Sequence, residues 1–356
     1  MIRLVLLLLV VGCGAEKATD RQVPGPGVAG DKKGAGDDWP EEPATDDDLL
    51  PVPEPDPVPP APGNPRPDPD IPDSLPDPSG DTEKDGDGAK TQIEPQTTAC
   101  IKDTGAGLAR QVRCSNINFR VSVPDQCVSG GCGLIFDVHG WTMDGRLQEQ
   151  NTGLARQGMD AGYVVVQPDA PGRSWNRSHY PGVHDFMQQA KKAWAIDTDR
   201  VHFSGFSQGS MMTWYFICHH GDELASAAPI TYAGGGECFG AGKANPVIPV
   251  LYHHGKTDGF SSFANAQQSR DRIVEGHGMK KQDETSGNRF VKTTWKNTNG
   301  MVLETIFHEM TTSPMYGSGH CFPDPPDQTP YGCVGQSDYS WGEEVIRFFE
   351  NHQRGN

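Results

Sequence analysis

The sequence has no apolar stretch long enough to cross a membrane as a helix, which needs about 20 residues; its longest apolar run covers only residues 4–11. Basic residues are scarce as well, since 30 lysines and arginines stand against 47 acidic residues, and this balance argues against nucleic acid as a partner. There is no Cys-x-x-Cys pair and no histidine at zinc-ligand spacing from a cysteine, so the sequence indicates no metal site.

Residues 1–12 have the features of an export signal: Arg3, the apolar run and a small residue before Cys13. Val-Val-Gly-Cys at residues 10–13 resembles the bacterial lipobox, which implies cleavage before Cys13 and lipidation of that residue. Its acyl chains would anchor the protein stably in a membrane. Because residue 14 is Gly rather than Asp, we expect an outer-membrane or surface location; an ordinary secretory signal, with release into the medium, is the alternative.

Residues 14–98 have the composition of a linker. They contain 18 of the 30 prolines and a single aromatic residue, Trp39, and they carry most of the net charge of −17. Such a segment cannot bury enough apolar surface to offset the entropy lost on ordering. We therefore expect a lipidated Cys13 and a disordered linker over residues 13–98, followed by a catalytic domain over residues 99–356.

That domain is large enough for one α/β core. It contains eight cysteines, an even number that predicts four disulfides in an exported chain. The sequence leaves their connectivity open, and metal ligation is the alternative use of the thiols. Because short loops favour pairing between neighbours, we favour the pairs Cys100–Cys114, Cys127–Cys132, Cys218–Cys238 and Cys321–Cys333.

Apolar, β-branched runs alternate with helix-like segments along the domain. Strands are expected over residues 134–139, 163–167, 201–204, 247–253 and 302–308, and helices over 146–161, 185–194, 210–219, 263–277 and 343–351. We expect Pro168 to end the second strand and Pro249 to break the fourth. This alternation predicts an α/β fold, with a mainly parallel sheet covered by helices on both faces and functional loops at the strands' C-terminal edge.

The most informative motif is Gly-Phe-Ser-Gln-Gly at residues 205–209, a G-x-S-x-G sequence between an expected strand and an expected helix. In this context Ser207 would be the nucleophile of a strand–turn–helix elbow. The motif alone is also compatible with a glycine-rich turn that has no catalytic role.

A serine nucleophile needs a base, and the base needs an acid that orients it. Asp258 follows the expected strand that ends near residue 253, and His320 lies in a glycine-rich loop before the last helix, so the three occur in the order Ser, Asp, His. An ordinary Asx turn is the alternative for Asp258, and a solvent-exposed loop histidine is the alternative for His320. Asp271 and Asp283 are rival acids, and His308 and His277 are rival bases.

The oxyanion of an acyl-transfer reaction needs two backbone N–H donors. We expect them from Gln208, directly after the nucleophile, and from Trp141, in the loop after the first expected strand. His139 in that loop is interpreted as structural. Four further residues either line the substrate pocket or simply pack, and the sequence does not decide between these roles: Trp175, Asn176, His179 and Tyr180.

Four blocks of sequence together resemble the secreted polyhydroxybutyrate depolymerase-like and feruloyl esterase-like branch of the α/β-hydrolases. They are Asp-Val-His-Gly-Trp at 137–141, the serine motif through Thr213, His-Gly-Lys-Thr-Asp at 254–258, and Gly-His-Cys-Phe-Pro at 319–323. The resemblance covers residues 130–350. It implies hydrolysis of carboxylic esters through a serine acyl-enzyme, without a metal or an organic cofactor. In this family a small residue or a cysteine is common at the position of Trp141. Because of this difference the sequence does not predict the shape of the pocket there.

The sequence therefore predicts an exported, lipid-anchored serine esterase. Feruloyl or acetyl esters on polysaccharide and hydroxyalkanoate esters are both substrates that the resemblance implies. A serine peptidase on the same fold and a non-catalytic surface lipoprotein are the alternatives. The expected partners are an ester substrate, which could be polymeric, and a membrane; the oligomeric state stays open.

Overall fold

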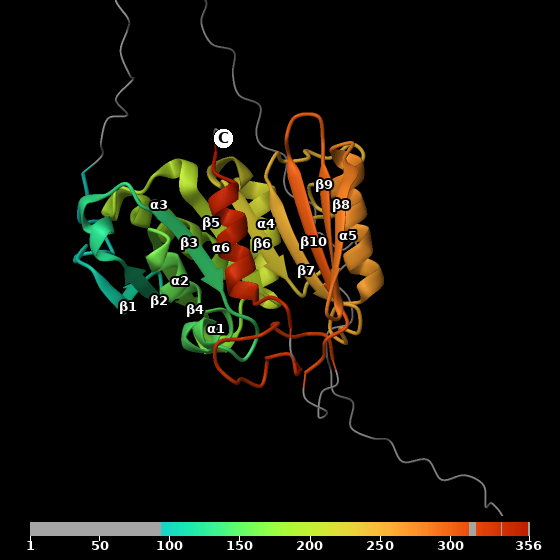
Figure 1. Ribbon diagram of the computed structural model, residues 1–356. Helices are drawn as coiled ribbons and strands as arrows, with labels where there is room; N and C mark the ends of the chain where they lie inside the picture. Colours follow the sequence, from blue (N-terminus) through green and yellow to red (C-terminus); the bar gives the residue numbers. More distant parts are fainter. Residues whose placement is uncertain (1–93, 313–317, 336, 355–356) are drawn as a thin grey trace, which may run out of the picture. The chain divides into compact units, whose positions relative to one another are not determined.

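The computed structural model describes residues 94–312, 318–335 and 337–354. The predicted signal peptide, Cys13 and nearly all of the predicted linker lie outside the described residues. The described chain forms an α/β domain around one ten-stranded sheet, with strand order β1-β2-β4-β3-β5-β6-β7-β10-β9-β8 (Figure 1).

The centre of this sheet is parallel and both of its margins are antiparallel. β4, β3, β5, β6, β7 and β10 pair in parallel, whereas β1 and β2 extend one edge and β9 and β8 the other in antiparallel pairing. The strand bounds are Gly107–Cys114 (β1), Ile117–Val123 (β2), Gly133–Val138 (β3), Tyr163–Asp169 (β4), Val201–Phe206 (β5), Ser226–Ile230 (β6), Val250–Gly255 (β7), Lys280–Gly287 (β8), Phe290–Lys296 (β9) and Val302–His308 (β10).

Helices cover both faces of the sheet. The α-helices are Gly145–Thr152 (α1), Leu154–Asp160 (α2), Tyr180–Ala193 (α3), Gln208–His220 (α4), Phe263–Gly276 (α5) and Trp341–Asn351 (α6). Short 3₁₀ turns span Asp125–Ser129 (η2), Pro171–Arg173 (η3), Arg177–His179 (η4), Thr198–Arg200 (η5) and Gly221–Glu223 (η6). α6, drawn in red, crosses the face of the sheet nearest the viewer in Figure 1.

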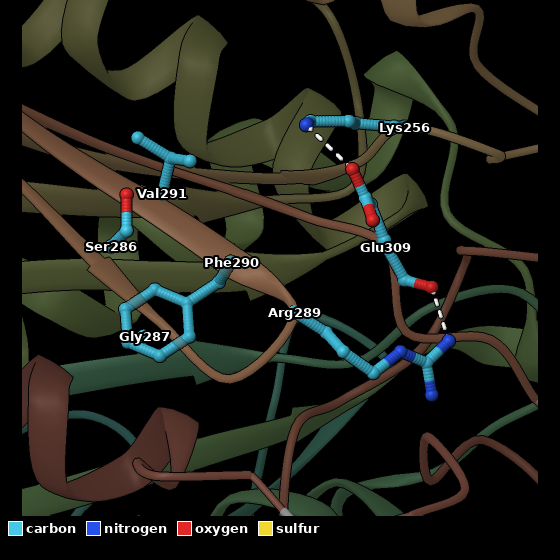
Figure 2. Close-up of a pocket in the computed structure, with 7 residues that line it drawn as sticks. All are labelled: Lys256, Ser286, Gly287, Arg289, Phe290, Val291 and Glu309. Atoms are coloured by element: carbon cyan, nitrogen blue, oxygen red, sulfur yellow. Dashed lines mark hydrogen bonds and ion pairs between the residues drawn. The ribbon is translucent and has the colours of Figure 1, made fainter.

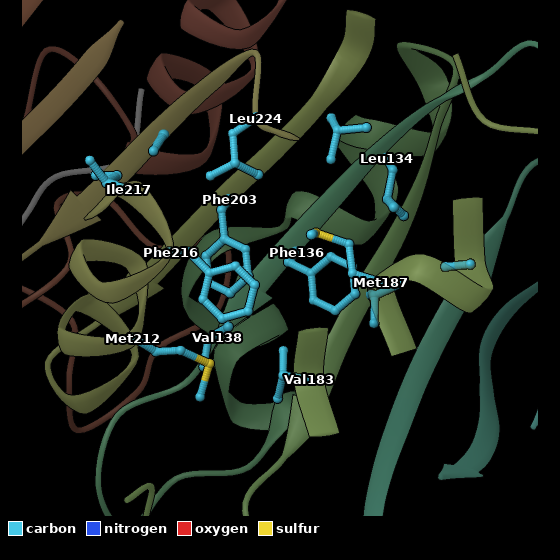
Figure 3. Packing of buried hydrophobic residues seen from close by; sticks show 14 of the residues in the cluster. Leu134, Phe136, Val138, Val183, Met187, Phe203, Met212, Phe216, Ile217 and Leu224 are labelled. Atoms are coloured by element: carbon cyan, nitrogen blue, oxygen red, sulfur yellow. The ribbon is translucent and has the colours of Figure 1, made fainter. Parts of the chain in front are cut away.

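The two faces have separate hydrophobic cores because side chains alternate along a strand. On β3, Phe136 belongs to the larger core beneath α3, α4 and α5, whereas Ile135 belongs to the core beneath α1, α2 and α6. In the larger core, Phe203 of β5 stacks on Phe136 at 5.6 Å and on Phe216 of α4 at 4.2 Å between ring centroids (Figure 3). Burial on both faces explains why apolar residues are frequent in the central strands, although β5, β7 and β10 also bury histidines.

The expected elements differ from the structure at four points. The helix expected over residues 146–161 is two helices, because Gly153 adopts a left-handed conformation with φ 63°. The helix expected from residue 185 begins at Tyr180, with a proline in its first turn. β4 continues through Pro168, although its pairing with β3 ends at Val166; β7 begins directly after Pro249, which agrees with the expected break there. β1, β2, β6, β8 and β9 were not expected from the sequence.

The four disulfides join the cysteines that are neighbours in sequence, as the sequence analysis favoured: Cys100–Cys114, Cys127–Cys132, Cys218–Cys238 and Cys321–Cys333. Within the described ranges, no helix is both long and apolar enough to pass through a bilayer.

Candidate active site

The residues singled out in the sequence lie in loops that follow parallel strands. Ser207 follows β5, His139 to Trp141 follow β3, Asp258 follows β7, and His320 lies in the long connection from β10 to α6. Since β3, β5, β7 and β10 run in the same direction, their C-terminal ends share one edge of the sheet.

Ser207 occupies a strained turn between β5 and α4. Its φ of 55° and ψ of −113° lie outside the regions that side-chain-bearing residues normally adopt. The turn brings α4 against the end of β3 so closely that a Cβ on Gly209 would lie 2.0 Å from the carbonyl oxygen of Val138. The second glycine of the motif is therefore required by packing. Ser207 itself is only partly buried, so its hydroxyl has access to solvent.

Asp258 and His320 form a buried hydrogen-bonded pair. His320 Nδ1 lies 2.8 Å from Asp258 Oδ2, and the two side chains are 62 residues apart in sequence. The other carboxylate oxygen, Oδ1, accepts the backbone N–H groups of Phe260 at 2.8 Å and Ser261 at 3.0 Å. With its carboxylate fixed at both oxygens, Asp258 holds the imidazole in one orientation and leaves Nε2 for another partner.

The loops that carry Asp258 and His320 touch through their backbones. A Cβ on Gly255 would lie 2.2 Å from the carbonyl oxygen of Gly319, and the N–H of Gly319 donates to the Thr257 carbonyl at 3.1 Å. His320 also packs against Phe206, the residue before Ser207, with ring centroids 4.8 Å apart. These contacts place the imidazole beside the serine turn.

The loop after β3 lies directly against Ser207. A Cβ on Gly140 would lie 3.2 Å from Ser207 Cβ and 2.8 Å from the Phe206 ring, so only glycine fits there. His139 holds this loop from behind, because its Nε2 accepts the Ala170 N–H at 3.0 Å while Nδ1 lies 2.6 Å from the Gly140 carbonyl oxygen. Burial lowers the pKa of His139 to about 4, so the ring is neutral and donates from Nδ1.

No family model matches the chain. A stretch of 140 residues, 38% of the chain, is 31% identical to a bifunctional acetylxylan esterase/xylanase of Neocallimastix patriciarum and covers 20% of it. A stretch of 118 residues, 32% of the chain, is 28% identical to feruloyl esterase D of Neurospora crassa and covers 40% of it. The chain thus spans less than half the length of either relative.

A solved acetyl xylan esterase from Aspergillus awamori superimposes with a TM-score of 0.51 at 14% identity, over 70% of this chain and 98% of that one. The chain has the α/β-hydrolase fold. The two sequence relatives agree with the expected resemblance to the feruloyl esterase-like branch of these proteins.

One contact of this α/β-hydrolase domain was missed by sequence reasoning. Trp175, 5% exposed, donates from Nε1 to the His139 carbonyl at 3.0 Å, and its backbone N–H donates to the Gln208 side chain at 2.9 Å. It thereby joins the two loops from which the oxyanion donors are expected. The side chain of Gln208 carried no signal for this role, because the motif specifies only the glycines and the serine.

The other three residues proposed for the pocket occupy different positions. Tyr180 is buried in the first turn of α3, with its ring 4.9 Å from that of Tyr215, while Asn176 is exposed and caps η4 by accepting the Ser178 N–H at 3.0 Å. His179 is half-buried at the end of that turn. Trp175 and Tyr180 thus have packing roles, and lining of a pocket stays a prediction for all four.

The rival acids and bases bond to other groups. Asp271 is exposed and pairs with Arg270 at 2.8 Å, and Asp283 lies on the exposed strand β8. His277 ends α5 and approaches the Pro246 carbonyl oxygen at 3.2 Å. His308 accepts the Met310 N–H at 3.1 Å, and burial lowers its pKa to about 3.

The mouth of the site is apolar. Trp141, Phe260 and Met211 are large hydrophobic side chains that are exposed by 45%, 64% and 38%. Phe260 lies 4.9 Å from His320 between ring centroids, and Met211 is one turn beyond Ser207. Next to Trp141, the hydroxyl of Thr142 hydrogen-bonds that of Tyr331 at 2.7 Å.

A separate hollow of about 240 Å³ lies beside the β8–β9 hairpin (Figure 2). Lys256 and Glu309, 2.9 Å apart, close one side of it, and Phe290 projects from the other. Ser207, His320 and the loop after β3 are not among its lining residues, so it is distinct from the site around the serine.

Proposed function

We propose that this chain is an exported, lipid-anchored serine esterase that cleaves carboxylic esters through an acyl-enzyme. The observation that carries the proposal is the 2.8 Å bond between Asp258 and His320 in loops that adjoin the strained turn of Ser207. Nucleophile, base and orienting acid are the groups that such a reaction requires, and they occur here at the edge where this fold places them.

In the first half of the reaction Ser207 Oγ attacks the ester carbonyl carbon, and His320 Nε2 accepts the hydroxyl proton. Asp258 stabilises the imidazolium that forms and remains a carboxylate throughout. The tetrahedral intermediate then expels the alcohol, which takes the proton from His320. An ester bond to Ser207 replaces the substrate's ester bond.

The negative charge on the carbonyl oxygen is held by the backbone N–H groups of Gln208 and Trp141. The first belongs to the first residue of α4 and the second follows Gly140, which lies against Ser207. Losing one such donor typically lowers kcat about 10²- to 10³-fold. Water then attacks the acyl-enzyme with His320 again as the base, and the acid is released.

The substrate we propose is an ester with an apolar or aromatic acyl group carried on a polysaccharide. The exposed Trp141, Met211 and Phe260 offer more apolar surface than an acetyl group needs. The names of the relatives, a feruloyl esterase and two acetylxylan esterases, support an ester carried on a polysaccharide, and the feruloyl esterase's name supports an aromatic acyl group. Hydroxyalkanoate esters would fit the same apolar mouth and belong in the test.

Replacement of the serine tests the proposal. Ser207→Ala should lower hydrolysis of p-nitrophenyl esters by about 10⁴-fold or more while the fold stays intact. Ser210→Ala is the matched control, because Ser210 lies in the same helix and its buried hydroxyl has no partner among the described residues. Retention of substantial turnover by Ser207→Ala would sink the assignment.

A substrate panel then separates the ester classes. We expect higher kcat/KM on methyl ferulate than on acetylated xylan or hydroxybutyrate oligomers. Faster cleavage of peptides than of all esters would favour a peptidase. Failure of the wild-type protein to react with a fluorophosphonate probe would favour a non-catalytic lipoprotein.

A further inference from the structure

A compact cluster of metal-ligating side chains lies away from the active site, where α3 meets the end of α4. It consists of His184 on α3, His220 at the last position of α4, and Glu223 on η6. One ligand atom from each lies within 4.8 Å of the other two. His184 Nε2 is 2.7 Å and His220 Nδ1 is 3.6 Å from the same oxygen, Glu223 Oε1.

We propose that His184, His220 and Glu223 form a binding site for a divalent transition-metal ion, with Zn²⁺ as the best match. Two imidazoles and one carboxylate are a donor set typical of zinc. Ligand atoms about 2.1 Å from a tetrahedral zinc ion lie roughly 3.4 Å from one another. The separations from Oε1 fall on either side of that value, and the ion would take the place of the direct contact between His184 and Glu223.

The two imidazoles must reorient to bind one ion. Their rings are stacked, with centroids 3.8 Å and planes 18° apart, so their in-plane lone pairs run nearly parallel. The His220 side chain is 22% exposed and belongs to the last residue of α4, which leaves it room to turn. The same exposure gives the ion a path from solvent and leaves a coordination position for water.

Lys191 should weaken metal binding, and its replacement is therefore the sharpest test. Its Nζ lies 2.6 Å from Glu223 Oε2, the carboxylate oxygen not shared with the histidines. A positive charge at that place repels a cation and competes for the carboxylate. Replacing Lys191 by an uncharged residue should therefore strengthen metal binding. If the cluster only stabilised the fold, this replacement would have no such effect.

The described residues contain one further set of three potential ligands, His308 with Cys321 and Cys333. Both sulfurs of that set are joined in a disulfide and offer no thiolate, so it carries no site. The cluster on α3 and α4 has no such obstacle. A bound ion would link the C-terminal end of α4 to α3. The N-terminal end of α4 directly follows Ser207.

The experiment is a calorimetric titration of the EDTA-treated mature protein with zinc sulfate. We expect one ion per chain, and a dissociation constant raised about tenfold or more by His184→Gln and by His220→Gln. Lys191→Met should lower it by about tenfold. His219→Ala is the matched control, because His219 pairs with Glu237 at 2.8 Å outside the cluster and should bind zinc as the wild type does.

Zinc binding that is absent, or that survives both cluster substitutions, overturns the proposal. So does a loss caused by His219→Ala, which would indicate adventitious binding to surface histidines. Thermal unfolding with and without zinc is the second measurement: the ion should raise Tm for the wild type and Lys191→Met, but not for His184→Gln. Both measurements are independent of ester hydrolysis.

Discussion

At the residue scale, the strain at Ser207 is held by its neighbours. A conformation of this kind costs about 1–3 kcal/mol and persists only where the surroundings fix it. The Ser207 N–H donates to the Ile230 carbonyl at 3.1 Å, and Gly209 lets α4 approach β3. The close packing around the turn leaves no room for a side chain at the glycine positions of the motif. The motif therefore indicates the turn, although the packing itself cannot be seen in the sequence.

Other residues of the site were not predictable for a physical reason. Asp258 and His320 could be proposed from their order and their places after strands. The link from Trp175 to His139 and Gln208 depends on side chains brought together by the fold, 36 and 33 residues apart. No local pattern encodes such a contact, so the sequence could suggest only that Trp175 follows a strand.

Trp175→Phe is predicted to lower kcat about two- to tenfold with little change in KM. The substitution keeps most of the apolar bulk but removes the Nε1–H that holds the His139 carbonyl at 3.0 Å, a bond whose loss is worth about 0.5–1.5 kcal/mol. The loop bearing the Trp141 N–H would then hold the oxyanion less well. Steady-state kinetics on a p-nitrophenyl ester measures the effect.

Trp194→Phe provides the control for that substitution. Trp194 is buried and donates from Nε1 to the Thr104 carbonyl at 3.1 Å, a bond of the same kind on the β1 side of the domain. It should lower stability by a similar amount and leave kcat unchanged. Equal losses of kcat in both variants would show that Trp175 acts only through global stability.

At the element scale, the segment between Cys321 and Cys333 connects two parts of the site. It begins directly after His320, and its Tyr331 hydroxyl bonds Thr142 in the loop after β3. The Phe322 ring stacks on Phe206 at 4.2 Å. The segment therefore ties the base to the serine turn and to the oxyanion loop, and its disulfide fixes its ends.

Replacing Cys321 and Cys333 together by alanine should cost about 3 kcal/mol of unfolding free energy and lower kcat as well. The matched control is the pair Cys100 and Cys114, whose sequence separation of 14 is close to 12 for the first pair, but which joins residues at the β1 edge. Its removal should cost similar stability and spare kcat. Urea unfolding and steady-state kinetics on both variants make the comparison, and equal kcat would refute a role for the disulfide in positioning His320.

Most central strands of the sheet were predictable, with β6 as the exception, and its margins were not. β3, β5 and β10 are buried on both faces and have apolar residues at half or more of their positions. β8, Lys-Lys-Gln-Asp-Glu-Thr-Ser-Gly, is almost wholly exposed and is held only by pairing with β9. An exposed edge strand of this kind lacks the alternation of apolar and polar residues from which a strand is predicted. The early start of α3, by contrast, had a signal in the proline of its first turn.

At the scale of the whole molecule, the domain buries an unusual number of histidines. Burial lowers the pKa of His139 and His254 to about 4 and that of His308 to about 3. The pKa values of His202 and His253 are also well below the ordinary range, because both rings are buried. In the folded protein these histidines therefore stay neutral at pH values below about 6.5, where they are protonated in the unfolded chain.

The free energy of unfolding is accordingly predicted to fall by several kcal/mol between pH 7 and pH 5, because each of these histidines costs up to about 1.4 kcal/mol per pH unit below its unfolded pKa. Asp137 opposes this trend: burial raises its pKa to about 6, so stability gains as the pH falls from 6 towards 4. Burial also raises the pKa values of Glu149 and Asp169, so three carboxyl groups oppose five histidines, and the histidines outweigh them. Urea titrations across this range test the sign, and His308→Asn should flatten the dependence; rising stability towards pH 5 would contradict it.

The last prediction concerns where this domain works. If Cys13 carries the lipid, Cys13→Ser should move the protein from the membrane fraction to the soluble fraction in an enteric host, with no change in kcat/KM on a soluble ester. Intact-mass measurement of the wild type should show an acylated cysteine as the first residue. Gly14→Asp is the matched variant: it keeps the lipid and should shift the protein from the outer to the inner membrane. Membrane retention of Cys13→Ser would contradict the anchor, and the esterase proposal would stand without it, because the residues proposed for catalysis all lie beyond residue 130.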